Sequence, residues 1–395
     1  MLNTEDRKPL FSLAFSKDEF ADRREKLLAR MRTENIDAVV VTSAANYYYL
    51  CGLALSVPLG TFALIIRKDG QGYWVIRKIE ITNLEEFVEA AGWSEVAKAV
   101  GDEENSEEEF SRAITRVVGE KARVGFELSS RSVSFSNIQA VARDSSIEIW
   151  DVTPMIESLR MVKTPKEIEY LARSGEMTAA AMNDTIAALK DGVTDSQLAA
   201  QASYSLLSRG SDTLTQTPFV TAGLRSALAH STSVNERILP GEIVNFEFSS
   251  VVERYCTPVF RGAVLGQPSN EIRDFHDASL AALNAALSGF APGMTSHDAD
   301  RVLRAELERT GYAQYSLCRA AYSIGIGYMP SWDEDHIMKV REHDQRILQP
   351  GMCFHIVPSM YKLGLGGVCC SMSVVMTETG TRNLVPHQPK LYVVD

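Results

Sequence analysis

One acidic residue stands inside a stretch whose composition predicts a buried strand. Glu247 lies near the end of residues 243–248, which are otherwise largely apolar. A buried carboxylate is costly unless it is paired, hydrogen-bonded or protonated, and such a group often has a raised pKa and a chemical role. Glu247 is therefore the first candidate for a nucleophile or general base. The alternative is a structural carboxylate paired with Arg254 or Arg261.

Two further residues near this strand could take part in the same chemistry. His230 lies in a loop-like stretch ahead of the strand, and an imidazole beside a carboxylate can act as a general acid or base. A structural histidine in the core explains the same spacing equally well. Arg261 belongs to an apolar strand over residues 259–263, where it could neutralise Glu247 or bind a substrate carboxylate through two hydrogen bonds.

A glycine-rich segment leads into a polar loop that carries Trp332, Asp333 and Glu334. The segment around Gly325 and Gly327 lacks the third glycine and the strand-to-helix context of a dinucleotide site. The loop either lines a pocket for a small cation or is a solvated turn, and both interpretations stay open. No HxxxH, HExxH or paired Cys/His spacing indicates zinc, and no GxSxG motif indicates a serine hydrolase.

The elements that must position these residues fall into two domains. Residues 16–151 alternate between helical and strand patterns, which predicts an α/β domain. The sharpest boundary follows, because Thr164 is a helix N-cap, Pro165 suits the first helical position and Glu167 completes a capping box. Two helices, strands, two helices and strands then predict an α+β domain with helices on a curved antiparallel sheet. We expect the two domains to span residues 1–155 and 156–395.

The composition narrows the function classes. The chain of 395 residues carries 51 acidic residues against 40 lysines and arginines, a formal net charge of −11. No basic stripe occurs, so we expect no nucleic-acid partner, and no apolar run approaches the ~20 residues of a membrane span. Six cysteines without a CxxC motif indicate reduced thiols. We therefore expect a soluble, cytoplasmic protein.

Four segments resemble those of a known superfamily. They are residues 163–169, 240–244, 350–354 and 377–380, and their order and intervals are similar to those of the methionine aminopeptidase, prolidase and creatinase superfamily. The resemblance covers essentially the whole chain. It implies an α/β N-terminal domain followed by an α+β catalytic domain with the pita-bread fold. It also implies a homodimer in which the partner's N-terminal domain closes the pocket, so that Tyr47 and Tyr48 act in trans.

The metallopeptidases of this superfamily hold two metal ions with two Asp, one His and two Glu side chains. The resemblance places these positions at Glu247, Pro258, Tyr322, Val357 and Ser371. Four of the five cannot provide the required carboxylate or imidazole. We therefore expect no metal and no other cofactor.

Two metal-free branches, ectoine hydrolase and creatinase, are then the closer resemblance. The central-strand Glu of ectoine hydrolase corresponds to Glu247, and the segment around Tyr322 is also similar. This resemblance implies a metal-independent hydrolase of a non-peptide C–N bond, in a cyclic amidine, guanidino or amide group of a small polar metabolite. Glu247 would attack or activate water, and His230 would shuttle the proton.

The remaining candidates would bind the small-molecule substrate. Asp333 and Glu334 would hold a cationic part of it, and Arg261 an anionic part. The full set of binding candidates is Tyr255, Arg261, Tyr322, Trp332, Asp333, Glu334, His355, Tyr47 and Tyr48. Two other functions stay open: an Xaa-Pro peptidase-like metalloenzyme with an altered metal site, and a non-catalytic pita-bread binding protein.

Overall fold

The structure is a computed structural model that describes residues 12–55, 61–143 and 146–395. The chain divides into two compact units, Met1–Arg160 and Met161–Asp395, which are described separately. The boundary expected at residues 155 and 156 falls inside helix α6 (Thr153–Arg160). Helix α6 stays with the N-terminal unit because Met155 and Ile156 are buried and Arg30 of that unit donates a hydrogen bond to the Met155 carbonyl.

The N-terminal unit contains a six-stranded sheet in the order β4-β3-β2-β1-β5-β6. Strand β2 is antiparallel to β1 and β3, whereas the pairs β1–β5, β5–β6 and β3–β4 are parallel. The strands are β1 (Ala38–Val41), β2 (Ala63–Arg67), β3 (Gly72–Arg77), β4 (Ser94–Val100), β5 (Arg123–Phe126) and β6 (Glu148–Asp151). The other helices are α1 (Lys17–Glu34), α2 (Ala44–Cys51), α3 (Ile81–Ala91), α4 (Ser106–Val118) and α5 (Phe135–Arg143).

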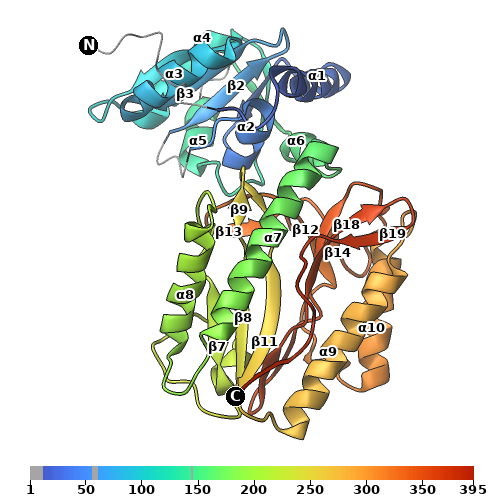
Figure 1. The fold of residues 1–395 in the computed structure, drawn as a ribbon. Helices are drawn as coiled ribbons and strands as arrows, with labels where there is room; N and C mark the ends of the chain where they lie inside the picture. The colour runs from blue at the N-terminus through green and yellow to red at the C-terminus, as the bar shows by residue number, and fades with distance from the viewer. Residues whose placement is uncertain (1–11, 56–60, 144–145) are drawn as a thin grey trace. The chain divides into compact units, whose positions relative to one another are not determined.

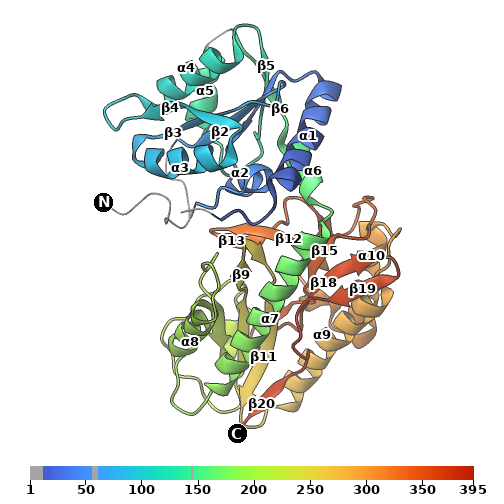
Figure 2. The same ribbon diagram turned by 45° about the horizontal axis from the view of Figure 1, so that its top comes forward.

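Alternation along β3 explains why helices cover both faces of this sheet. Val75 packs in one core cluster with Phe110 of α4. Its neighbour Trp74 points to the opposite face, where its ring contacts those of Tyr47 from α2 and Phe87 from α3. Figure 2 shows the sheet with its helices, and the arrangement is the α/β domain that the sequence predicts.

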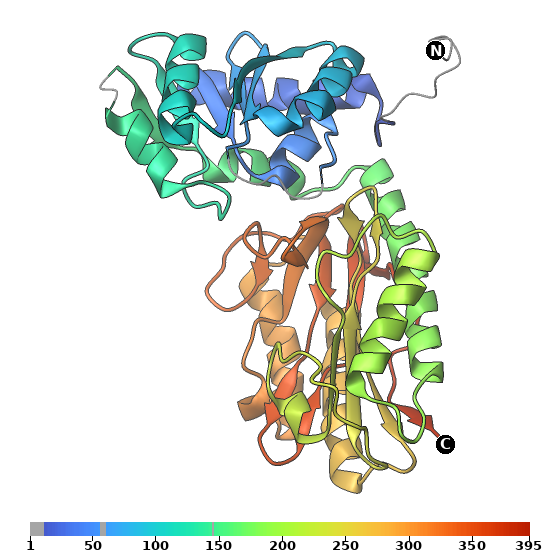
Figure 3. The ribbon, with the colours of Figure 1, turned by 90° about the vertical axis from the view of Figure 1, so that its left-hand side faces the viewer.

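The C-terminal unit packs two helix pairs around its strands. Figure 1 shows α7 and α8 on one flank and α9 and α10 on the other, and Figure 3 shows the same layers from the side. The helices are α7 (Pro165–Ala187), α8 (Asp195–Ser208), α9 (Asn270–Gly289) and α10 (Ser296–Thr310). One apolar core cluster joins side chains of all four helices to the strands: Met182, Leu198, Leu283, Leu303 and Phe246 are members. Burial of this apolar surface is the main source of stability.

The strands of this unit form two larger sheets and one small one. An eight-stranded sheet runs β19-β18-β15-β12-β10-β9, with β13 and β14 also paired to β12, and a second runs β20-β11-β8-β7. The first half of the strands comprises β7 (Phe219–Ala222), β8 (Ile243–Phe248), β9 (Val251–Val252), β10 (Tyr255–Cys256), β11 (Val259–Leu265), β12 (Ala321–Tyr328) and β13 (Ser331–Asp333). The others are β14 (Lys339–Val340), β15 (Cys353–Ile356), β16 (Met360–Lys362), β17 (Gly366–Val368), β18 (Met372–Thr377), β19 (Gly380–Asn383) and β20 (Tyr392–Val394).

Helix α7 begins as its sequence predicts and packs through a glycine. The Thr164 side chain accepts a hydrogen bond from the Glu167 backbone, and the Glu167 side chain accepts one from the Thr164 backbone, which is a complete capping box. A Cβ atom at Gly175 would lie 1.9 Å from the Leu384 carbonyl oxygen, so only glycine allows this approach. Among the described residues, no helix has the length and apolar character needed to cross a membrane.

Candidate functional site

Glu247 faces away from the main core of the C-terminal unit. It lies in β8, opposite Phe260 of β11 and Phe219 of β7. Its neighbours Phe246 and Phe248 belong to the apolar core cluster, so the alternation of the strand turns Glu247 toward the other face. No hydrogen bond or ion pair involves its carboxylate within the described part of the chain.

The surroundings of Glu247, called the recess below, are largely desolvated. Its side chain keeps partial solvent exposure, yet burial raises its pKa to about 7, an effect that the positive charge of Arg319 opposes. A group with such a pKa can accept or release a proton near neutral pH.

Arg319 supplies the positive charge near Glu247 and lies two residues before β12. Its guanidinium carbon lies 4.4 Å from the centre of the Tyr322 ring, and its Nη2 atom is 3.7 Å from Asp335 Oδ2. Its Nε atom is buried and has no hydrogen-bond acceptor among the described residues. The recess therefore combines one carboxylate with one guanidinium group that can still donate.

A chain of hydrogen bonds forms the wall of the recess. Trp332 Nε1 donates to Tyr322 Oη at 2.9 Å, and Tyr322 Oη lies 2.7 Å from His355 Nδ1. The other ring nitrogen of His355, Nε2, lies 2.6 Å from Ser371 Oγ, which also accepts from the Phe260 backbone N–H at 2.7 Å. Burial lowers the pKa of His355 well below its usual value and raises that of Tyr322 well above its usual value. Both side chains are therefore neutral at physiological pH.

The positions that the superfamily resemblance assigns to metal ligands do not fit a two-metal centre. Pro258 and Val357 have no donor atom in their side chains, and the hydroxyl groups of Tyr322 and Ser371 belong to the neutral hydrogen-bonded chain. Across the described ranges, Glu247 belongs to no cluster of three or more His, Cys, Asp or Glu side chains that could share a metal ion. The site therefore lacks the anionic oxygen and imidazole donors that two ions would need.

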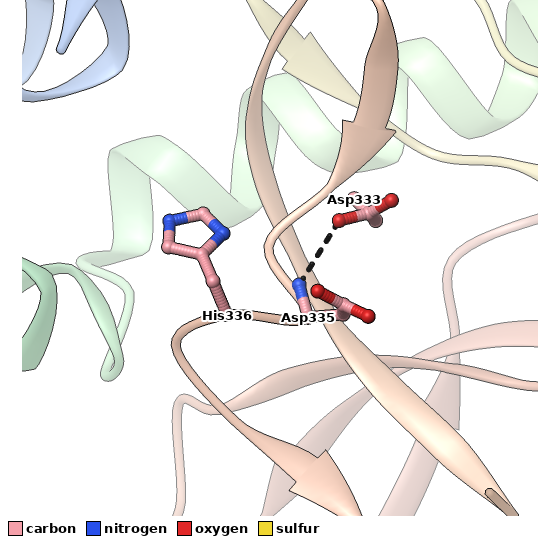
Figure 4. Close-up of side chains that lie close together, drawn as sticks. All are labelled: Asp333, Asp335 and His336. Carbon is pink, nitrogen blue, oxygen red and sulfur yellow. Dashed lines mark hydrogen bonds between the residues drawn. The ribbon is translucent and has the colours of Figure 1, made fainter. Parts of the chain in front are cut away.

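The one such cluster in the described residues is Asp333, Asp335 and His336, whose potential ligand atoms lie within 4.8 Å of one another (Figure 4). Asp333 Oδ1 already accepts from the Asp335 backbone N–H at 3.2 Å. Asp335 Oδ2 lies 3.2 Å from the Lys339 ammonium group and 3.7 Å from Arg319 Nη2. Because nearby cations already balance Asp335, the cluster gives no basis for a metal site. The predicted contact of Asp333 with a cationic substrate stays a prediction.

The structure gives Glu334 an internal partner. Its Oε2 atom lies 2.9 Å from Lys163 Nζ, and both side chains are only 1% exposed. Its Oε1 atom accepts from the Ile326 backbone N–H at 3.0 Å. The predicted binding of a substrate cation by Glu334 is not supported, because Lys163 already neutralises the carboxylate.

Arg261 and Tyr255 are also held by the protein itself. The Arg261 guanidinium is fully buried and donates to His387 Nδ1 and to the carbonyl groups of Phe260, Ser371 and His387. Tyr255 donates its hydroxyl proton to Glu167 Oε1 at 2.7 Å and its ring stacks on another tyrosine of α7. These contacts do not support the predicted binding of substrate by either residue, nor the pairing of Glu247 with Arg261.

His230 lies near the recess, and the two N-terminal tyrosines lie elsewhere in the chain. The exposed His230 ring is 5.9 Å from the ring of Phe219, which contacts Trp332 at the same centroid distance. Its proton-shuttling role stays a prediction. Tyr47 and Tyr48 are buried side chains of α2 in the N-terminal unit, and their action in trans also stays a prediction.

The structure adds residues that the sequence interpretation missed. Arg319 was not a candidate, and Ser371 was considered only as a lost ligand position. A signal for Arg319 exists in the sequence, because a lone cation directly precedes the apolar segment that contains Tyr322. No local signal links Ser371 to His355, since the contact depends on how two strands of the folded sheet pair.

Both parts of the chain match known protein families. Residues 169–378 match the family described as Metallopeptidase family M24, and residues 23–162 match the Creatinase/Prolidase N-terminal domain. The chain belongs to metallopeptidase family M24, as the resemblance of its segments predicts.

Relatives are similar in sequence over 69–94% of the chain, and solved structures share its fold over 95% of it. The Xaa-Pro dipeptidase of Pyrococcus furiosus is 25% identical over 371 residues, which is 94% of this chain and 99% of that protein. An uncharacterized peptidase of Bacillus subtilis is 28% identical over 69% of this chain and 75% of its own length. A prolidase structure from Thermococcus sibiricus has a TM-score of 0.84 at 23% identity and covers 95% of this chain and 99% of that one. An Xaa-Pro dipeptidase structure from Bacillus anthracis has a TM-score of 0.81 at 21% identity, covering 95% and 100%.

These relatives contradict the predicted reaction. The sequence interpretation favoured a metal-independent hydrolase of a non-peptide C–N bond, similar to ectoine hydrolase or creatinase. Three of the four relatives are Xaa-Pro dipeptidases or a prolidase, and the chain belongs to a metallopeptidase family, so that prediction is wrong. The prediction failed because the loss of metal-ligand side chains shows only that the metal site is altered. It does not show which substrate the site binds.

Proposed function

We propose that the C-terminal unit recognises a small zwitterionic peptide, of the Xaa-Pro type named for its relatives, in the recess around Glu247. The observation that carries this proposal is the pairing of an unpartnered carboxylate with a guanidinium group whose buried Nε has no acceptor in the described residues. Glu247 would bind the ammonium group and Arg319 the carboxylate. The Tyr322 and Trp332 side chains would enclose the ligand between these charges.

A second candidate function is hydrolysis of the bound peptide at the same site. It is supported by membership of a peptidase family and by a carboxylate with a pKa of about 7, which suits a general base. The ligand positions do not fit a two-metal centre, so we derive no step through metal ions. The two candidates share one binding mode and differ only in turnover.

Titration calorimetry with alanyl-proline tests the binding mode on the full chain. Glu247→Gln is expected to weaken binding about tenfold at pH 8, because a charge-assisted hydrogen bond is lost. Glu378→Gln, at an exposed glutamate of the β18–β19 hairpin, is the matched control and should bind like the wild type. Equal affinities of the wild type and Glu247→Gln would refute the proposal.

A turnover assay separates the two functions. Release of proline from alanyl-proline would be followed with the purified chain, with added Mn²⁺ and after chelation. Turnover that Glu247→Gln abolishes and Glu378→Gln preserves would establish hydrolysis at this site. Binding without turnover under all three conditions would establish a peptide-binding protein.

We also propose a cytoplasmic homodimer. The six free cysteines, of which five are buried, suit a reducing compartment. The dimer follows from the superfamily resemblance. Sedimentation velocity of the purified chain tests it, and a single monomeric species at micromolar concentration would contradict it.

A further inference from the structure

The hydrogen-bonded chain beside Glu247 restricts where the protons of its side chains can lie. It links Trp332, Tyr322, His355, Ser371 and the Phe260 backbone. The Trp332 and Phe260 groups at its two ends are N–H donors only, so the protons of the three middle side chains must be arranged between two donors. His355 is neutral because burial lowers its pKa, and it therefore brings one ring proton. Two arrangements satisfy the contacts.

In the first arrangement, Tyr322 donates to His355 Nδ1 and the proton on Nε2 is donated to Ser371. Ser371 Oγ then accepts two hydrogen bonds, from His355 and from the Phe260 backbone. Its own proton has no acceptor among the described residues, and the side chain is 0% exposed. A buried hydroxyl proton left without an acceptor destabilises this arrangement.

In the second arrangement, Ser371 donates to His355 Nε2 and the proton lies on Nδ1. His355 Nδ1–H then donates to Tyr322 Oη, which also accepts from Trp332 Nε1. The proton left over is that of the Tyr322 hydroxyl. Its surroundings differ from those of Ser371, because the Glu247 carboxylate acts electrostatically on Tyr322 and is itself partly exposed.

The comparison favours the second arrangement. Each arrangement leaves one hydroxyl proton without an acceptor in the hydrogen-bonded chain. In the first it is the proton of the fully buried Ser371, and in the second it is the proton of Tyr322, beside Glu247. Ser371 is 0% exposed, whereas Tyr322 is 5% exposed and lies near the partly exposed Glu247 carboxylate, so an acceptor for the remaining proton is more readily supplied at Tyr322. The position at which the superfamily resemblance expects a metal-binding imidazole thus carries a hydrogen-bond donor.

We propose that His355 is the Nδ1-protonated tautomer and that Tyr322 directs its hydroxyl proton into the recess, where it donates to a carbonyl or carboxylate oxygen of the ligand. The ligand part of this inference rests on the proposed function. The tautomer part does not, because it follows from the hydrogen bonds of the chain alone.

Nitrogen NMR of the full chain with ¹⁵N-labelled histidine tests the tautomer without ligand. The His355 signals are identified by their loss in His355→Gln. At pH 7.5 we expect a neutral ring with its proton on Nδ1. A proton on Nε2 would overturn the proposal, because Tyr322 would then donate to His355 and have no proton for a ligand.

Calorimetry with alanyl-proline tests the donor role. Tyr322→Phe should bind about tenfold more weakly than the wild type, since it loses one hydrogen bond to the ligand. Tyr204→Phe, at a tyrosine of α8 that is 69% exposed, is the matched control and should bind normally. Equal affinity for Tyr322→Phe and the wild type would overturn the donor role. Absence of binding to the wild type would refute the proposed function and the donor role with it, while the histidine spectrum still decides the tautomer.

Discussion

Replacing Lys163 with methionine should destabilise the C-terminal unit strongly. The Lys163 ammonium lies 2.9 Å from Glu334 Oε2 and 3.3 Å from Ser323 Oγ, and both members of the ion pair are 1% exposed. Water therefore cannot solvate Glu334 once its partner is removed. Breaking such a buried pair from one side costs about 3–5 kcal/mol. For a unit of this size, that corresponds to a fall of about 10 °C in the midpoint of thermal unfolding.

The assay is urea and thermal unfolding of the full chain, followed by circular dichroism and calorimetry. Lys166→Met is the matched control, because Lys166 forms an exposed pair with Glu169 whose members are 43% and 53% exposed. It should leave the free energy of unfolding nearly unchanged, because solvent screens an exposed pair. Adding Glu334→Gln to Lys163→Met should recover part of the loss, since no buried charge then remains. A Lys163→Met variant as stable as the Lys166→Met control would refute the reasoning.

Three further predictions concern stability. Burial raises the pKa of Glu247 from 4.5 to about 7. The neutral carboxyl group is tolerated in the fold at low pH, and the free energy of unfolding falls as the pH rises from about 4.5 to about 7 and the group ionises. Glu247→Gln should therefore be more stable than the wild type by up to about 3 kcal/mol at pH 8 and equally stable at pH 4 in urea titrations; equal stability at both pH values would contradict this. Arg261→Lys should lower the free energy of unfolding by about 3 kcal/mol, because lysine cannot serve the four acceptors of the guanidinium, and a loss below 1 kcal/mol would contradict the structural role. Gly175→Ala should lower the thermal midpoint because its Cβ would lie 1.9 Å from the Leu384 carbonyl, and an unchanged midpoint would show that α7 can shift freely.

Features that depend on neighbours in sequence were predictable. The capping box of Thr164 and Glu167 involves residues three positions apart, and its pattern marked the start of α7 correctly. The strand that holds Glu247 was also recognisable, because a single carboxylate interrupts an apolar run. Its raised pKa follows from the same pattern, since burial is the larger cause.

Features that depend on distant partners were not predictable. Lys163 and Glu334 are 171 positions apart, and Arg261 and His387 are 126 apart, so nothing local shows that these charges are already satisfied. The sequence therefore suggested that Glu334 and Arg261 could bind a substrate, whereas both side chains are already bonded to other residues of the protein. The prediction of reaction class failed for a different reason: the loss of metal-ligand side chains is visible in the sequence, but the substrate depends on pocket shape.

A crystal structure of the full chain with alanyl-proline bound would test the central claim most directly. We expect the peptide in the recess of the C-terminal unit, with its ammonium group on Glu247, its carboxylate on Arg319 and an oxygen within hydrogen-bond distance of Tyr322 Oη. A peptide bound elsewhere, or one whose charged groups contact neither Glu247 nor Arg319, would contradict it.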